Sequence, residues 1–119
     1  MFNNIKSQMR KGLLEYCILS IISQHEAYSS DILDTLKKAN LVVVEGTVYP
    51  LLTRMKNEGL LSYRWQESTG GPPRKYYTLT EEGAALLAQL EEEWQSICQS
   101  ISQITKISLS IQYQNNTRL

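Results

Sequence analysis

Polar side chains gather on the outward positions of a helix that we expect over residues 46–58. These positions carry hydroxyl groups, one aromatic ring and two cations: Thr47, Tyr49, Thr53, Arg54 and Lys56. Hydroxyls and N–H groups at the start of a helix hold phosphates, and side chains there also reach base edges in the major groove of DNA. One interpretation is that the hydroxyls and the tyrosine face the DNA groove or its phosphates and the cations face the backbone. A solvated helix surface explains the same residues equally well.

A hairpin is predicted directly after this helix. Residues 61–65 and 75–79 alternate between polar and apolar side chains and are rich in aromatic rings, which is typical of strands. We expect the intervening residues 66–74, with two adjacent glycines and two adjacent prolines, to form a long and stiff loop.

The basic residues of this hairpin favour the DNA interpretation. Arg74 and Lys75 stand where the expected loop meets the second strand, and Arg64 stands on the facing strand. A basic hairpin next to an exposed helix is the arrangement of a winged helix-turn-helix, in which cations neutralise DNA phosphates. Residues 45–77 are therefore the predicted DNA-reading segment.

The net charge of zero, from 12 basic and 12 acidic residues, conceals an uneven distribution. Residues 1–79 hold ten Lys and Arg against seven Asp and Glu, which gives +3, whereas residues 80–119 hold two against five, which gives −3. The basic excess thus lies in the half that carries the predicted DNA-reading segment.

Several classes of protein are not indicated by the composition. The longest apolar run, residues 16–22, is shorter than the roughly 20 residues of a membrane-spanning helix, and no signal-peptide pattern is present. Cys17 and Cys98 lack the spacing of a metal site, and His25 has no catalytic partner at a suitable spacing. We therefore expect a cytoplasmic protein with reduced thiols, no membrane association, no metal, no cofactor and no enzymatic activity.

Two more helices are expected before residue 46. Apolar residues recur at helical spacing over residues 7–23, and a second helix is expected over residues 30–39, with N-cap chemistry from Ser29 onward and Asn40 as its stop. Residues 24–28 are predicted to be a linker and residues 41–44 a short strand. The fold class is accordingly mainly α (α+β), a winged helix-turn-helix domain.

A long final helix is predicted to begin after Thr80, which is a suitable N-cap. Its apolar positions are spaced alternately three and four residues apart: Leu87, Leu90, Trp94, Ile97, Ile101, Ile104 and Ile111, with Ser108 the one polar member of the series. Such a heptad pattern is typical of a coiled coil, and a domain this small cannot bury it alone. The predicted organisation is a DNA-binding domain over residues 1–79, a dimerisation helix over 80–112 and a flexible tail over 113–119.

Four motifs follow one another along the chain: KGLLEYCIL at residues 11–19, GTVYPLLTRM at 46–55, EGLL at 58–61 and GPPRKYYTLTEEG at 71–83. Together they resemble the motifs of the PadR family of bacterial transcriptional regulators. The resemblance covers roughly residues 10–100 and implies a winged helix, a homodimer built through the C-terminal helix, and repression of a nearby operon relieved by a small molecule. It also implies that Thr47, Tyr49 and Arg54 contact double-stranded operator DNA and that Arg74 and Lys75 belong to the wing.

The single C-terminal helix is similar to that of the short subgroup of the family. In its multidrug-sensing members a tryptophan on this helix stacks against flat aromatic compounds between the subunits, and Trp94 stands at a matching place. That resemblance implies a small aromatic effector, whereas a heptad position by itself is typical of a core residue. The chain departs from the family at Ser29, where a glycine is common; Ser29 either caps the following helix or offers a hydroxyl to a phosphate.

An alternative function remains open at this stage. A winged helix also serves in contacts between proteins, and the C-terminal helix would then pair with a helix of a different partner. The oligomeric state of the protein distinguishes the two functions.

Overall fold

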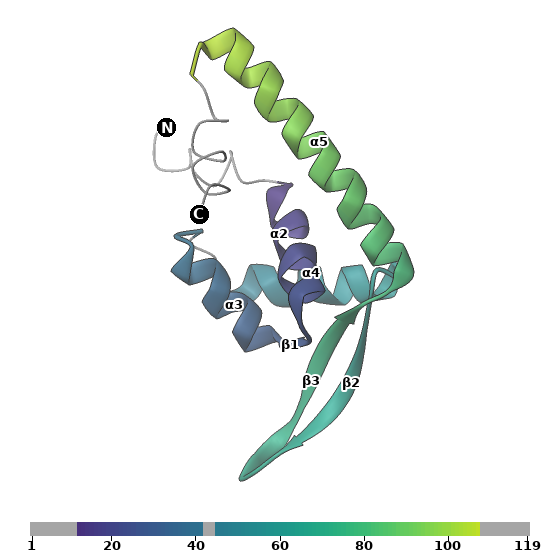
Figure 1. Ribbon diagram of the computed structural model, residues 1–119. Coiled ribbons are helices and arrows are strands. Elements are labelled where there is room, and N and C mark those ends of the chain that lie inside the picture. Colours follow the sequence, from purple (N-terminus) through teal and green to yellow (C-terminus); the bar gives the residue numbers. More distant parts are fainter. Residues whose placement is uncertain (1–11, 42–44, 108–119) are drawn as a thin grey trace. The chain divides into compact units, whose positions relative to one another are not determined.

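The computed structural model describes residues 12–41 and 45–107, which form four helices and one small sheet. Along the chain these are α2 (Leu13–Gln24), β1 (Ala27–Tyr28), α3 (Ser29–Lys38), α4 (Glu45–Asn57), β2 (Leu61–Ser68), β3 (Gly71–Leu79) and α5 (Glu81–Thr105). The chain divides into two compact units, residues 1–87 and 88–119. The expected fold class is confirmed (Figure 1).

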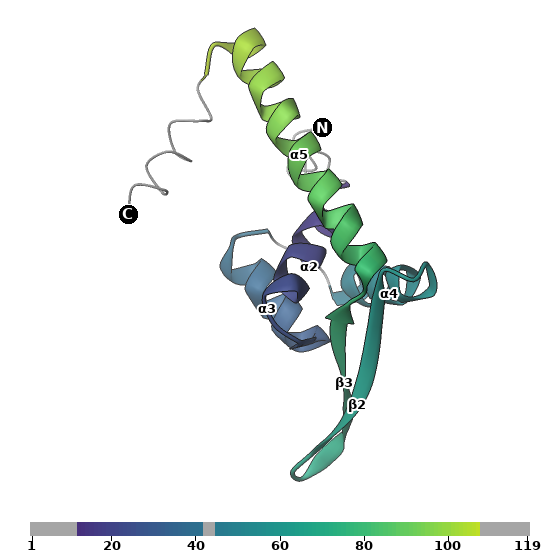
Figure 2. The same cartoon turned by 45° about the vertical axis from the view of Figure 1, so that its right-hand side comes forward.

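The first unit packs three helices against one end of the sheet. α2 contacts α3 and β3, and α4 contacts α3 and β2. The core consists of buried hydrophobic side chains from these elements, from β1 and from the start of α5: Ile18, Leu19, Ile22, Ala27, Ile32, Leu33, Leu36, Val48, Leu52, Met55, Leu61, Tyr77 and Leu87. Because the hairpin is anchored at this end alone, the rest of β2 and β3 extends away from the helices as a wing (Figure 2).

Helix ends follow the signals in the sequence, with one correction. Asn40, at φ 62°, ends α3 as expected, and Gly59, at φ 82°, ends α4. At the other end of α3, the Tyr28 N–H donates to the Asp31 carboxylate over 3.1 Å. Ser29 is therefore the first residue of the helix and does not cap it, because Asp31 satisfies the free N–H from inside the first turn.

The prediction of a long loop at residues 66–74 was wrong. β2 continues to Ser68 and β3 begins at Gly71, so that only a two-residue turn separates them, with Gly70 at φ 80°. Pro72 and Pro73 are accommodated at an irregularity of the pairing, where both lie opposite Glu67. A proline lacks the N–H that a regular strand pairing uses, and such an irregularity makes no use of it.

A third strand lies where a linker was expected. Ala27 and Tyr28 form β1 and pair antiparallel with Tyr77 and Tyr76 of β3, which gives the strand order β1-β3-β2. The strand expected at residues 41–44 falls largely outside the described residues, and Leu41 itself is not in a strand. The N-terminal end of α3 thus lies directly beside the wing.

The start of α5 is held tightly against the hairpin. The Gly83 N–H donates to the Thr80 hydroxyl over 3.0 Å, which confirms Thr80 as the N-cap, and that hydroxyl lies 2.7 Å from the carbonyl oxygen of Gly59. A Cβ at Gly83 would overlap the carbonyl oxygen of Leu60 and lie 2.9 Å from the Leu79 side chain. Glycine is therefore the residue that fits where α5 leaves the sheet.

The far end of α5 comes earlier than expected. The helix ends at Thr105, and the next residue, Lys106, has a φ of 64°. Ser108, Ile111 and the predicted tail over 113–119 lie outside the described residues. No helix in the described part of the chain is long and apolar enough to span a membrane.

Candidate nucleic-acid interface

A groove of about 460 Å³ opens between the wing, α4 and the start of α3. It is lined by aromatic rings, hydroxyls and two cations: Tyr28, Ser29, Ser30, Tyr49, Thr53, Trp65, Arg74, Lys75 and Tyr77. A smaller hollow of about 170 Å³ adjoins it, shares Thr53, Lys75 and Tyr77 with it, and adds Lys56, Asn57 and Tyr63. We call the two together the wing groove. Among the described residues, no aspartate or glutamate lines it.

The lysines of the wing groove rest on aromatic rings. The Lys75 ammonium lies 4.6 Å from the ring centre of Tyr63 and 5.4 Å from that of Trp65, and Lys56 lies 5.6 Å from Tyr63. Tyr63 also contacts Tyr77, and the centres of the two rings are 5.9 Å apart. Cation–π attraction places the two ammonium groups on one wall without neutralising their charge.

Arg74 is held in the same way at the other side of the groove. Its guanidinium lies 5.2 Å from the ring centre of Tyr28, which stacks on Tyr76 with a centre-to-centre distance of 3.7 Å. Arg74, like Lys56 and Lys75, forms no ion pair with any carboxylate of residues 12–41 and 45–107. The wing groove therefore presents three cations whose charge is not offset locally.

Two tyrosines of the hairpin, Tyr76 and Tyr77, have a pKa raised above the ordinary value. Desolvation by burial is the main cause that raises the pKa of Tyr77, and the electrostatic interaction with the neighbouring Tyr63 adds to it. A hydrogen bond to Tyr28 is the main cause that raises the pKa of Tyr76. Tyr76 and Tyr77 therefore add no anionic charge near neutral pH.

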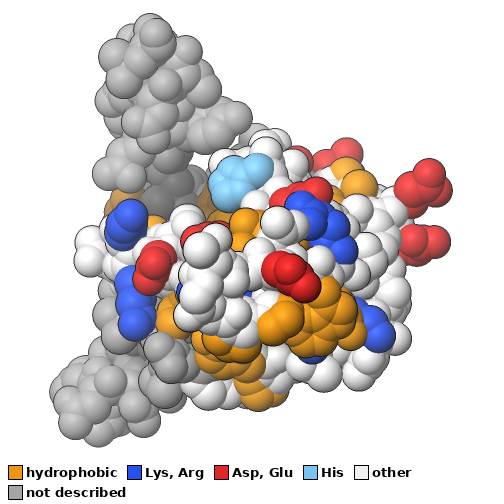
Figure 3. Space-filling model, turned by 90° about the horizontal axis from the view of Figure 1, so that it is seen from below, with side chains coloured by type: hydrophobic (Ala, Val, Ile, Leu, Met, Phe, Trp, Pro, Cys, Tyr) orange, Lys and Arg blue, Asp and Glu red, His pale blue; other side chains and the backbone are white. Residues whose placement is uncertain are grey.

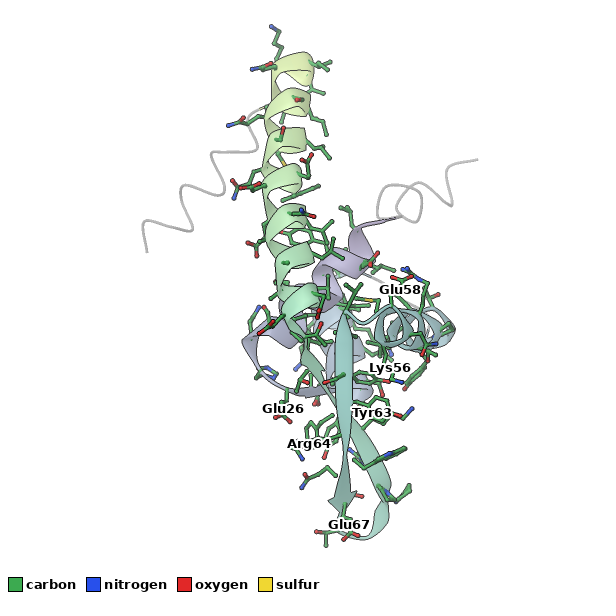
Figure 4. All side chains as sticks on the ribbon, turned by 90° about the vertical axis from the view of Figure 1, so that its right-hand side faces the viewer. Glu26, Lys56, Glu58, Tyr63, Arg64 and Glu67 are labelled. Carbon is green, nitrogen blue, oxygen red and sulfur yellow. The ribbon has the colours of Figure 1, made fainter. Side chains whose placement is uncertain are left out.

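Arg54 lies elsewhere on α4. Its guanidinium donates to Glu58 over 2.8 Å and to Glu15 of α2 over 3.4 Å, and the hydrogen bond with Glu58 is the main cause that raises its pKa. Its charge is thus offset by two carboxylates, and it ties α4 to α2. Figure 4 shows Lys56 and Glu58, the carboxylate that pairs with Arg54, at different places on α4 and its C-terminal end.

The structure brings most of the predicted DNA-contacting residues together, and it adds others. Ser29, Tyr49, Thr53, Lys56, Arg74 and Lys75 all line the wing groove. Thr47 is exposed on α4 but lines neither hollow, and Arg54 is engaged in its ion pairs. Sequence reasoning missed the rings that support the cations, Tyr28, Tyr63 and Trp65. Their alternation along the chain indicated strands but not which cation each would face.

Seen from below, the first unit carries hydrophobic and basic side chains on one surface. Figure 3 shows hydrophobic side chains, a class that includes tyrosine and tryptophan, next to Lys and Arg on this face. Trp65 is 60% exposed and Tyr49 is 44% exposed. Such large exposed rings are costly to leave in water and are typical of a contact surface.

The residues predicted for dimerisation fall into two groups along α5. Leu87 is buried in the first unit and Leu90 is half-buried. Beyond them Trp94, Ile97, Ile101 and Ile104 are exposed, with Trp94 at 38% and Ile104 at 80%. Cys98, beside this stripe, is a half-buried free thiol. Residues 88–107 thus carry an apolar stripe that lacks a cover within the described part of the chain.

Comparison with known proteins gives a consistent result. Residues 18–89 match the model of the transcriptional regulator PadR-like family. A PadR-like transcription factor from Bacteroides fragilis is 57% identical, with 86% of this chain and 99% of that chain covered and a TM-score of 0.72. A PadR-like transcriptional regulator from Bacillus cereus is 38% identical, with 84% and 98% covered and a TM-score of 0.74. Bacillus subtilis PadR, solved in complex with operator DNA, is 26% identical, with 66% and 45% covered and a TM-score of 0.62.

Proposed function

Because the chain belongs to the PadR-like family of transcriptional regulators, we propose that it binds operator DNA through the wing groove and represses transcription. The observation that carries the proposal is the set of three cations without ion-pair partners, Lys56, Arg74 and Lys75, around a groove whose described lining has no carboxylate. A relative in the same family has been solved with operator DNA. Regulation of transcription also implies an activity on the chromosome, and hence in the bacterial cytoplasm.

The side chains of the groove divide into two roles. Lys56, Arg74 and Lys75 neutralise phosphates, which gives affinity for any duplex and strong dependence on salt. Tyr49 and Thr53, on the face of α4 that lines the groove, together with Thr47 at its start, meet base edges in the major groove. The hydroxyl of Ser29, at the first turn of α3, adds a contact to the backbone.

Dimerisation would set the distance between two such reading surfaces. The exposed stripe on α5, formed by Trp94, Ile97, Ile101 and Ile104, pairs with the same stripe of a second copy and removes these side chains from water. Two recognition helices held roughly 34 Å apart enter successive major grooves of a pseudo-palindromic site. The homodimer therefore supplies specificity that one basic groove alone does not.

An effector site is the last part of the proposal. Trp94 is the aromatic residue of the α5 stripe, and its ring is 38% exposed in the single chain. Stacked between two copies, a flat aromatic molecule would cover that ring and shift the pairing of the helices. Titration of a Trp65→Phe protein with planar aromatic compounds tests this step, since Trp94 then provides the fluorescence signal and a Trp94→Phe protein is the control.

The main experiment measures binding to the DNA upstream of the protein's own gene, at several salt concentrations, together with light scattering after gel filtration. We expect a dimer whose affinity falls steeply with salt. Affinity that does not change with salt, or no shift of that DNA, would contradict the proposal. A monomer that pairs only with a different protein would favour the alternative function, a winged helix that contacts another protein.

A further inference from the structure

The outer face of the wing, opposite the wing groove, carries a second set of cation and aromatic contacts. In an antiparallel hairpin, neighbouring residues point to opposite faces, so Arg64 and Tyr76 lie on the face away from Tyr63 and Lys75. Figure 4 shows Arg64 near Glu26 on one side of the hairpin and Tyr63 near Lys56 on the other. This outer set is not explained by the proposed function.

Arg64 is the centre of the outer set and its charge is offset. Its Nε and one terminal nitrogen both lie 2.9 Å from a carboxylate oxygen of Glu26, the residue just before β1. Its guanidinium also lies 4.9 Å from the ring centre of Tyr76. Arg64 therefore links β2, on the far edge of the sheet, to the chain that precedes β1.

The contacts continue from Tyr76 to the wing groove. Tyr76 and Tyr28 are direct partners across β3 and β1, and their rings stack at an angle of 28°. Tyr28 in turn supports the guanidinium of Arg74. One continuous series of contacts thus runs from Glu26 through Arg64, Tyr76 and Tyr28 to Arg74.

Arg74 depends on this series for its position. β1 pairs with β3 only at Tyr76 and Tyr77, so Arg74 lies in the part of the wing that only β2 supports. Because Arg74 has no ion-pair partner in the described chain, the Tyr28 ring is its link to the helices. A surface ion pair such as Glu26–Arg64 contributes little to the free energy of unfolding. Its effect is instead to fix the positions of the side chains that it contacts.

We infer that Glu26 and Arg64 are positioning residues, which brace the wing and thereby hold Arg74 at the mouth of the groove where it meets a phosphate. This inference rests on the proposed function for its effect on DNA. It assigns to Arg64 a role other than the direct backbone contact that its charge suggests.

The test uses the full-length protein and DNA from upstream of its own gene. Simple electrostatics predicts that Glu26→Gln, which removes a negative charge, strengthens binding to DNA. If Glu26 and Arg64 position Arg74, the opposite is expected: Glu26→Gln should bind DNA about threefold to tenfold more weakly. Coupling free energies between neighbouring groups correspond to changes in affinity of this size. Glu67→Gln, at the wing tip, removes the same charge outside the brace, and it should bind at least as tightly as the unmodified chain.

A second comparison asks whether Glu26 acts through Arg74. In an Arg74→Ala background, Glu26→Gln should cause no further loss of affinity, because the cation that it positions is absent. Glu26→Gln should also lower the slope of affinity against salt although it makes the protein more positive. Binding by E26Q as tight as that of E67Q, or a loss that persists undiminished in the R74A background, would overturn the inference.

A measurement without DNA separates this inference from the proposed function. Hydrogen exchange of the amides of Gly71 and of residues 74–76 should be faster in E26Q than in the unmodified protein, because the wing separates more often from the helices. Equal exchange would overturn the brace even if DNA binding is confirmed. Faster exchange in a chain that binds no DNA would support the brace while the proposed function fails.

Discussion

The two faces of the β2–β3 hairpin carry the same kinds of side chain in different electrostatic settings. On the groove face, Lys75 stands over Tyr63 and Trp65, and no carboxylate of the described chain pairs with it. On the outer face, Arg64 stands over Tyr76 and is paired with Glu26. The charge of a cation that contacts only an aromatic ring stays available to bind an anionic ligand. The charge of a cation that also pairs with a carboxylate is offset within the protein.

This difference changes what the basic excess of residues 1–79 means. Arg54, on α4, follows the pattern of Arg64, because Glu58 and Glu15 offset its charge. The number of lysines and arginines in a sequence therefore overestimates the surface that a polyanion meets. The cations to test are those that the structure leaves without partners.

The largest effect on stability is expected from a change at the junction between the hairpin and α5, which both faces of the hairpin share. Gly83→Ala places a methyl group against the carbonyl of Leu60 and the side chain of Leu79, and we expect it to lower the free energy of unfolding by about 3 kcal/mol. Denaturation with urea measures this loss. Gly46→Ala, where a Cβ meets nothing within 4 Å, is the control and should be neutral or slightly stabilising. Equal stabilities of the two variants would contradict this account of the α5 junction.

The next effect concerns two cations that line the wing groove. Replacing Arg74 and Lys75 together by alanine should weaken DNA binding at low salt by about tenfold for each lost phosphate contact, and so by about a hundredfold for each bound chain, without changing the midpoint of thermal unfolding. Fluorescence anisotropy with labelled DNA measures the affinity. Lys37→Ala with Lys38→Ala removes the same charge from the end of α3, outside the wing groove, and should cost less than about threefold. Similar losses in the two double variants would show that only net charge matters.

Arg54 tests the prediction that a cation with carboxylate partners contributes little to DNA binding. Arg54→Gln leaves the wing groove intact and removes an ion pair that already offsets the charge, so binding to DNA should change by less than about threefold. Thermal stability should fall slightly at low salt, and the difference should vanish at high salt. Tenfold weaker binding together with a lower dependence on salt would place Arg54 on the phosphates after all.

Local signals in the sequence predicted the scaffold well. Thr80, Asn40 and Gly59 each act through bonds to residues a few positions away, so residue type and neighbours suffice to predict them. The loop expected at residues 66–74 failed because two prolines indicate a turn, while the register of β2 against β3 leaves them room opposite Glu67. β1 was missed because a strand of two residues has no periodicity.

The candidate site was predictable only in part, for a related reason. Tyr49, Thr53, Arg74 and Lys75 were found because a helix followed by a basic hairpin has a local pattern. One partner of Arg54, Glu58, lies four residues away at helical spacing, but its other partner Glu15 and the Arg64 partner Glu26 lie 39 and 38 residues away, and no local pattern indicates such distant pairs. Which cations remain free is thus a property of the tertiary structure.

The central claim is that the unpaired cations of the wing groove hold DNA phosphates. The most direct test is the dependence of DNA affinity on salt for the unmodified protein and for Lys75→Ala, plotted as the logarithm of affinity against the logarithm of salt concentration. We expect the slope to fall by about 0.9 for each bound chain that loses Lys75, and so by about twice that for a dimer. Parallel lines for K75A and the unmodified protein would contradict the claim.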